Sequence, residues 1–185
     1  MKKSNANIIN YQLKFKSSVE AMIVTALFIA LTYVFIAFLP IQLPGLGSGG
    51  LVHLGNVPML VGAILFGKKV GALSGGIGMA LFDLLSPYAI WAPYTLVIVA
   101  IMGYVVGAIA EKHNEIKWYI VSVFLALVIK VVGYYFAEVI LFNWNFITPL
   151  LSIIGNVSQV AVAGIFVIPF IKYLRKILKK TNLFG

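Results

Sequence analysis

The chain has 185 residues, of which 62% are hydrophobic and only 10% are charged, and its mean hydropathy is +1.03. This composition excludes an ordinary soluble domain and predicts an integral membrane protein. The absence of cysteine excludes a disulfide framework, a thiolate metal site and a cysteine nucleophile. The formal net charge is +9, but the basic residues cluster beside apolar runs, as in the flanks of membrane helices, which argues against a nucleic-acid partner.

Glycine, proline and lysine divide the chain into six apolar segments, so we expect one all-α domain over residues 1–185 with six transmembrane helices. The first segment follows four lysines but is longer than a signal-peptide core and has no small-residue cleavage site, so we interpret it as a permanent helix. After it, the proline- and glycine-rich residues 40–55 predict a long irregular loop. The spans are expected at about 18–39, 56–66, 70–85, 92–110, 118–142 and 149–174.

Lysine and arginine lie almost entirely on one side of these spans. Four precede the first span, two lie between the second and third, two lie between the fourth and fifth, and five lie at the end of the sixth or beyond it. Only Lys130 departs from the pattern, so the positive-inside rule places both termini in the cytoplasm and loops 40–55, 86–91 and 143–148 outside. The second and third spans are short for a bilayer of roughly 30 Å, so other helices must surround them, or non-helical segments lining a cavity must extend them.

Spaced glycines predict close helix packing in the bundle. Gly67, Gly71 and Gly75 repeat at a spacing of four, as do Gly103 and Gly107, and small residues at this spacing let helices approach closely.

Polar side chains gather in the outer half of the predicted bundle, where they are costly unless they face protein or water. Lys130, Tyr134 and Glu138 are spaced i, i+4 and i+8 and form one stripe along the fifth span. Two interpretations stay open. The charges either form ion pairs that only fix helix packing, Lys130 with Asp83 or Glu138 with a neighbour, or orient a polar ligand in a water-accessible pocket.

Aromatic side chains surround the same outer mouth. Tyr88, Trp91, Tyr94, Tyr135 and Trp144 suit an interfacial belt when taken singly, and a flat heterocycle when taken together with the nearby amides. The candidate substrate-binding residues are His53, Asn56, Asp83, Trp91, Tyr94, Lys130, Tyr134, Glu138, Asn143, Trp144, Asn156 and Gln159.

His53 has two open interpretations of its own. It either caps the second helix or solvates the loop, or it belongs to a first loop that folds over the mouth, with Gly45, Gly47, Gly49 and Gly50 as hinges. The GLGSGG segment in this loop is not a phosphate cradle, because no strand precedes it and no GK[ST] follows it.

The sequence disfavours an enzyme and a self-sufficient carrier. His53, Asp83 and Lys130 are the only candidates for catalysis, and neither HExxH nor GxSxG occurs, so we expect no catalytic residues, no metal site and no cofactor. A stand-alone secondary carrier usually shows repeated halves with broken helices in matching positions, and we see no such repeat.

The chain resembles the riboflavin-type S components of energy-coupling factor (ECF) vitamin transporters. The resemblance rests on HLGNVPMLVGAILFGKKVGALSGGIGMALFDLLSPY (residues 53–88), on WAPYTLVIVAIMGYVVGAIA (residues 91–110), on the span pattern and on the pair Ala26 and Ala30 in the first span. It implies a multi-pass protein of the bacterial plasma membrane that binds a vitamin or its precursor from outside.

The same resemblance implies partners. The first span, through Ala26 and Ala30, is expected to dock on a transmembrane coupling subunit (EcfT), which two cytoplasmic ATPases (EcfA and EcfA′) drive. The resemblance favours a small ligand, hydroxymethylpyrimidine (a thiamine precursor) or pyridoxine, with riboflavin and a stand-alone carrier as alternatives.

Overall fold

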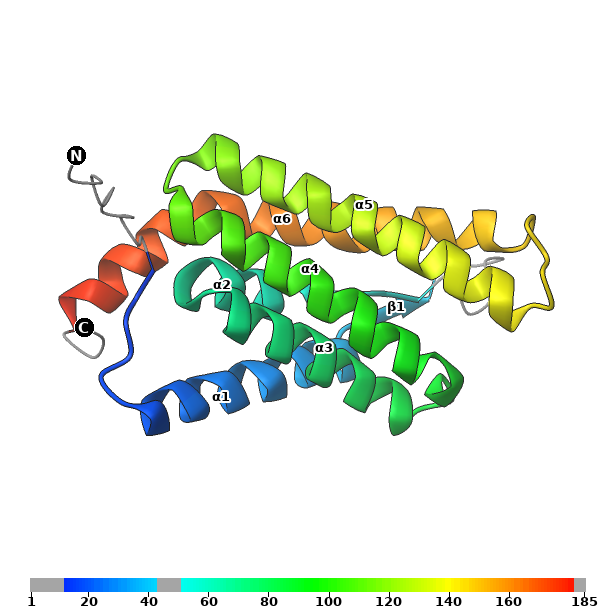
Figure 1. Cartoon of the computed structure of the whole chain (residues 1–185), viewed down its shortest axis with the longest axis horizontal. Coiled ribbons are helices and arrows are strands. Elements are labelled where there is room, and N and C mark those ends of the chain that lie inside the picture. The colour runs from blue at the N-terminus through cyan, green and yellow to red at the C-terminus, as the bar shows by residue number, and fades with distance from the viewer. Residues whose placement is uncertain (1–11, 43–50, 182–185) are drawn as a thin grey trace, which may run out of the picture.

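The computed structural model describes residues 12–42 and 51–181, and this part of the chain is mostly helical (Figure 1). Every predicted span corresponds to one helix, with ends displaced by a few residues except for the last helix, which continues six residues beyond the expected end at Leu174. The elements are α1 (Ser18–Ala37), β1 (Pro40–Gln42), β2 (Leu51–His53), α2 (Asn56–Phe66), α3 (Lys68–Leu84), the 3-10 helix η2 (Ala89–Trp91), α4 (Ala92–Lys112), α5 (Ile116–Leu141) and α6 (Pro149–Lys180).

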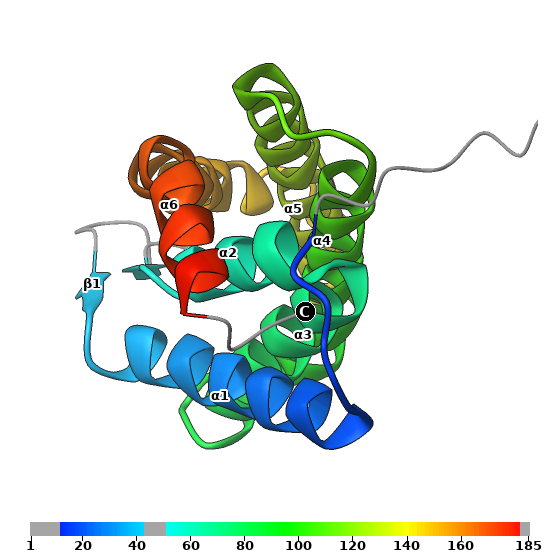
Figure 2. The same ribbon diagram turned by 90° about the vertical axis from the view of Figure 1, so that its left-hand side faces the viewer.

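In the described part of the chain, four helical segments are long and apolar enough to cross a membrane, namely α1, residues 89–112, α5 and α6. The shorter α2 lies in the middle of the end-on view, where α1, α3, α4 and α6 pack around it (Figure 2). Nine of its 11 residues are buried. The expectation that other helices surround the short second span is therefore confirmed, whereas the count of six spans and the cytoplasmic termini stay predictions.

Glycines allow the close contacts around α3. Gly67, between α2 and α3, has a φ of +103°, a conformation that other residues rarely adopt. Where α3 crosses α4, a Cβ on Gly103 would overlap the carbonyl of Gly71, and a Cβ on Gly71 would press on Ala63. The packing role that the glycine spacing predicts is confirmed here.

The first long loop contains regular structure that the sequence analysis does not anticipate. β1 and β2 pair antiparallel, with Pro40 opposite His53 and Gln42 opposite Leu51. Strands of three residues are too short to show a two-residue period, which is why the segment reads as irregular. Residues 43–50, with the predicted hinges Gly45, Gly47, Gly49 and Gly50, lie outside the described residues.

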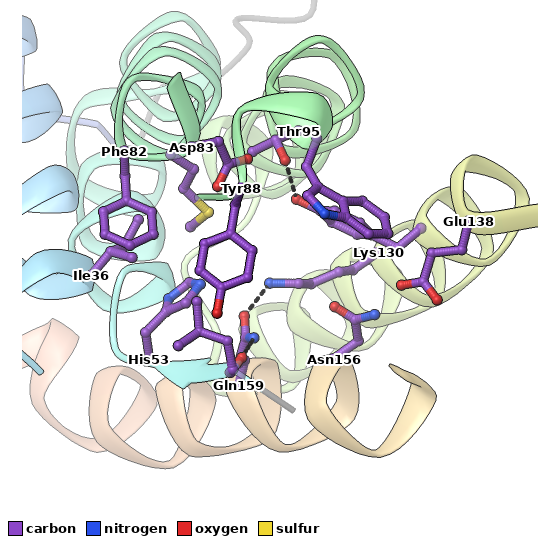
Figure 3. A pocket seen from close by; sticks show the side chains of 14 residues that line it. Ile36, His53, Phe82, Asp83, Tyr88, Thr95, Lys130, Glu138, Asn156 and Gln159 are labelled. Carbon is purple, nitrogen blue, oxygen red and sulfur yellow. Dashed lines mark hydrogen bonds between the residues drawn. The ribbon is translucent and has the colours of Figure 1, made fainter. Parts of the chain in front are cut away.

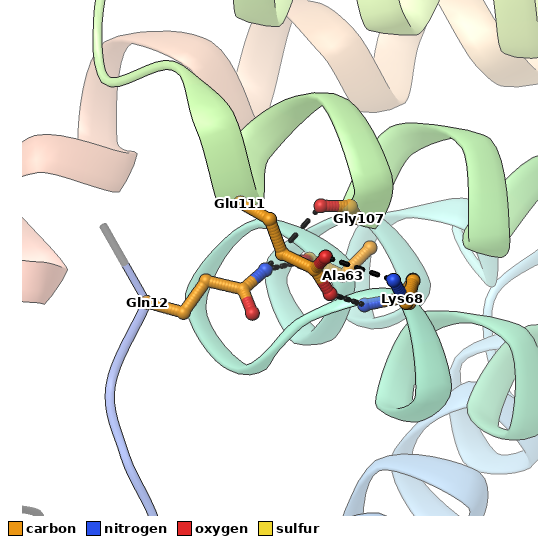
Figure 4. A network of polar contacts seen from close by, with 5 residues as sticks. All are labelled: Gln12, Ala63, Lys68, Gly107 and Glu111. Carbon is orange, nitrogen blue, oxygen red and sulfur yellow. Dashed lines mark hydrogen bonds and ion pairs between the residues drawn. The ribbon is translucent and has the colours of Figure 1, made fainter. Parts of the chain in front are cut away.

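A polar network holds together the end of the bundle where α2 meets α3 (Figure 4). The side-chain amide of Gln12 donates to the carbonyls of Ala63 (3.4 Å) and Gly107 (3.3 Å), which joins the segment before α1 to α2 and α4. Lys68 and Glu111 form an ion pair at 3.1 Å across α3 and α4. The N-terminal end of α1 and the C-terminal end of α6 lie on the same side of the molecule (Figure 1).

Candidate substrate-binding site

A cavity lies at the opposite end of the bundle, between the C-terminal ends of α1, α3 and α5 and the N-terminal parts of α4 and α6 (Figure 3). Together with the open space at its mouth, it encloses about 570 Å³ between the lining atoms. Its walls come from seven elements, α1, β2, α3, η2, α4, α5 and α6, and from the turn after α3. The lining residues are Ile36, Leu51, His53, Met79, Phe82, Asp83, Tyr88, Trp91, Thr95, Lys130, Tyr134, Glu138, Asn156 and Gln159.

The polar stripe of α5 faces this cavity. Lys130, Tyr134 and Glu138 all line it, as their i, i+4, i+8 spacing predicts for side chains that avoid lipid. Lys130 is only 2% exposed and Glu138 only 3%. The stripe therefore places an amine, a phenol and a carboxyl group along one wall of a mostly buried space.

Lys130 is held by an amide rather than by a carboxylate. Its Nζ donates to Oε1 of Gln159 at 2.5 Å, and Nε2 of Gln159 donates to the carbonyl of Leu51 at 2.5 Å, so the chain from α5 to α6 ends at β2. The predicted alternative of a Lys130–Asp83 ion pair is wrong, because among the described residues neither side chain takes part in an ion pair. Asp83 lines the cavity from α3, whereas Lys130 extends from α5 toward α6.

Glu138 has a neutral neighbour. The hydroxyl of Ser152 donates to its Oε2 at 2.6 Å, which connects the end of α5 to the start of α6. The pairing of Glu138 is thus a hydrogen bond, not the ion pair proposed as one alternative. Together with Asp83 and Asn156, Glu138 leaves acceptor groups in the lining for a ligand to use.

His53 lies in β2, where it bonds the backbone just before α2 and lines the cavity. Its Nδ1 accepts a hydrogen bond from the backbone N–H of Gly55 at 3.2 Å, just before α2, while the ring lines the cavity. Burial and the positive charge of Lys130 hold the pKa of His53 well below its usual range, so the imidazole is neutral at pH 7. Because Nδ1 accepts, the proton belongs on Nε2, as a donor.

Aromatic rings form much of the rest of the wall. Trp91 contacts the ring of Phe142 edge-on at 5.9 Å, and Phe82 stacks against Tyr88 at 6.4 Å. The hydroxyl of Tyr134 donates to Thr95 at 2.8 Å, which fixes a ring face between α5 and α4. Flat apolar faces beside donors and acceptors suit a polar aromatic ligand.

Four of the twelve candidate residues do not line the cavity. Asn56 is fully buried in the first turn of α2, where its side-chain amide has no hydrogen-bond partner among the described residues, and Tyr94 packs against the hydrophobic core. Asn143 and Trp144 follow α5 with φ of 53° and 62°, and Trp144 is 70% exposed. These left-handed residues turn the chain toward α6, which the sequence does not reveal.

The lining also contains residues that sequence reasoning missed. Ile36, Leu51, Met79, Phe82 and Thr95 carry no charge or amide, so a search for polar groups at depth passes over them. Thr95 follows Trp91 by four residues, and Phe82 directly precedes Asp83. Their closeness in the helix to candidate residues is therefore the signal that could have identified them. The eight candidates that do line the cavity are His53, Asp83, Trp91, Lys130, Tyr134, Glu138, Asn156 and Gln159.

Comparison with protein families gives a match over residues 16–176 to the model described as "ECF-type riboflavin transporter, S component". The chain belongs to this S-component family. It is accordingly an integral, multi-pass membrane protein, and its family consists of substrate-binding subunits of vitamin transporters and not of enzymes.

Individual relatives agree with this assignment. The S component is 25% identical over 166 residues to the thiamine precursor transporter HmpT of Lactococcus lactis subsp. cremoris, covering 90% of this chain and 92% of the relative. It is 30% identical over 103 residues to an uncharacterised protein of Pyrococcus woesei, covering 56% of this chain and 69% of that one.

A solved structure shares the fold. The structure titled "Structure and mechanism of the S component of a bacterial ECF transporter" superposes with a TM-score of 0.71, covering 88% of this chain and 99% of that one at 20% identity.

Proposed function

We propose that this S component captures a small hydroxymethylated nitrogen heterocycle, with hydroxymethylpyrimidine as the ligand, for delivery across the membrane. The observation that carries the proposal is the cavity in which ring faces, a buried amine and two carboxyl groups meet. The similarity to a thiamine precursor transporter over nine-tenths of the chain supports the pyrimidine.

The lining offers complementary chemistry for such a ligand. An amino group on the ring needs acceptors, which Asp83 and Glu138 supply, and the ring nitrogens need donors, which Lys130 supplies. Trp91 and Tyr134 offer aromatic faces for stacking. Asn156 and Gln159 on α6 carry both donors and acceptors for the hydroxymethyl group.

Native mass spectrometry and calorimetry of the detergent-purified protein test the ligand. We expect hydroxymethylpyrimidine to bind at least about tenfold more tightly than pyridoxine or riboflavin, because specificity is a difference of affinities and the polar groups of the cavity match the pyrimidine. Preferred binding of riboflavin or pyridoxine would reassign the substrate. Binding of none of the three, together with transport by the protein alone in liposomes, would favour a stand-alone carrier.

We further infer that delivery requires a transmembrane coupling subunit and two cytoplasmic ATPases, with α1 as the docking helix. Ala26 and Ala30 lie on an exposed face of α1 beside Met22, which is 70% exposed. An apolar hollow runs next to Ala26 between α1 and the start of α3, bounded by Thr25 and Leu73. Small side chains on an exposed apolar face let a partner helix approach closely.

A further inference from the structure

The surface where α5 packs against α6, here called the seam, is apolar along one part of its length and basic along another. On α6 the residues that face it repeat every three or four positions, first apolar (Ala161, Ile165, Ile168) and then basic (Lys172, Lys176). One stripe of a single helix therefore runs from an apolar groove into a basic pocket at the lysine-rich end of the molecule. The substrate cavity uses neither part.

The basic pocket gathers cations without a carboxylate. Its lining residues are Asn114, Lys172, Arg175, Lys176, Lys179 and Lys180. Glu115 follows Asn114 in the chain, but its carboxylate bonds Lys117 at 2.7 Å. The lining thus carries five basic residues and no acidic one, although Glu115 also interacts electrostatically with Lys172.

Arg175 forms the inner wall of this pocket and is only 6% exposed. Within residues 12–42 and 51–181 its guanidinium donates only to uncharged acceptors, which are the hydroxyl of Tyr119 at 2.9 Å, the carbonyl of Ile64 at 3.1 Å and the side chain of Asn114. Its Nε is buried and has no partner among the described residues. A fixed, buried cation without a counter-charge favours an anion beside it.

The apolar groove begins about one helical turn away. Only apolar residues line it, including Ile120 and Phe124 from α5 and Ala161, Ile165 and Pro169 from α6. Phe124 is 61% exposed and Ile165 is 71% exposed, so both side chains project at the sides of the groove, and small side chains form its base. In Figure 1, α5 and α6 run side by side along this seam.

We propose that the seam binds one anionic glycerophospholipid, with an acyl chain in the groove and the phosphate in the basic pocket. An acyl chain alone would not need the cations, and a free phosphate would not need the groove, whereas a lipid uses both at once. Basic pockets between transmembrane helices at the lysine-rich side of a membrane protein suit anionic headgroups. The site does not depend on the identity of the vitamin.

Native mass spectrometry of the full chain tests the headgroup. The purified protein is mixed with equal amounts of phosphatidylglycerol and phosphatidylcholine, and we expect preferential retention of one phosphatidylglycerol. The double variant Lys176→Ala/Lys179→Ala should lower that retention about tenfold or more, because each lysine near an anionic headgroup contributes appreciably. The matched control Lys69→Ala/Lys112→Ala removes the same charge outside the pocket and should retain the lipid. Equal retention of both lipids, or equal loss in both double variants, overturns the proposal.

A second pair of variants tests the groove. Ala161→Phe fills it and should displace the acyl chain, whereas Val132→Phe on α5 places the same ring outside it. Ala161→Leu is a smaller filler if the phenylalanine variant fails to fold, as judged by its melting temperature. Inorganic phosphate at millimolar concentration should not displace the lipid from the wild type. Displacement by phosphate, with no effect of the groove variants, would make this an anion site only and overturn the lipid.

Discussion

Lys130 is the residue at which the binding and packing interpretations separate most clearly. It is a buried amine whose hydrogen-bond partner is an amide, so replacing it by methionine, which is of similar length, removes a polar group that forms no ion pair among the described residues. We expect Lys130→Met to weaken ligand binding about tenfold or more while the melting temperature stays equal or rises. The exposed variant Lys69→Met is the control. A lower melting temperature with unchanged affinity would show that Lys130 serves packing alone.

Glu138 gives a complementary test on the same helix face. Glu138→Ala removes an acceptor from the cavity and leaves the hydroxyl of Ser152 without its partner. Calorimetry should report an affinity lower by about tenfold, at a cost in stability of about 1 to 3 kcal/mol that leaves the protein folded. Unchanged affinity in a folded variant would assign the carboxyl group to the α5–α6 contact only.

The sequence predicted cavity-lining residues correctly where they carry a charged or amide group, because such groups are costly to bury in lipid. The spacing of Lys130, Tyr134 and Glu138 places them on one face by helix geometry alone, and the structure turns that face to the cavity. The partner of Lys130 was not predictable, because Gln159 lies 29 residues away and its approach depends on how α5 meets α6. The prediction that Trp144 lines the cavity was also wrong. Trp144 adopts a left-handed conformation after α5, and a tryptophan in the sequence does not indicate such a turn.

At the scale of elements, α1 is the helix whose exposed face most needs an explanation. A tryptophan at Ala26 adds a large ring to the small-residue face, without entering the core. We expect Ala26→Trp to abolish uptake and copurification with the coupling subunit while the isolated protein still binds its ligand. The variant Val132→Trp, at a position of α5 that is 49% exposed and away from α1, is the control. Loss of ligand binding in Ala26→Trp would instead make this face part of the structural core.

Helix positions followed from sequence because apolar runs and their glycine, proline and lysine boundaries are local signals. α2 matches its expected bounds, Asn56–Phe66, since Gly67 breaks the helix through its positive φ. The β1–β2 pair was missed because pairing of two three-residue segments depends on how the chain returns from α1 to α2. The length of α6 was underestimated because its last turns are basic and so lack the apolar pattern used to define a span.

For the whole molecule, the two ends of the bundle have different chemistry. One end holds the cavity with its carboxyl groups and rings, and the other holds the lysine clusters, the Lys68–Glu111 pair and the basic pocket. This separation follows from the alternation of basic and neutral loops in the sequence. It fits a protein that takes its ligand from one side of the membrane and meets its partners on the other.

The chain contains no cysteine, so single introduced cysteines can report its orientation without background labelling. Ile90→Cys and Ile147→Cys, at positions 61% and 78% exposed at the cavity end, should react with a membrane-impermeant maleimide in intact cells. Lys69→Cys and Lys112→Cys, at the opposite end, should react only after permeabilisation, because six spans with cytoplasmic termini place both inside. The unmodified chain is the control. Reaction of either Lys69→Cys or Lys112→Cys in intact cells would overturn this orientation, because the Lys68–Glu111 ion pair holds the two positions at the same end of the bundle.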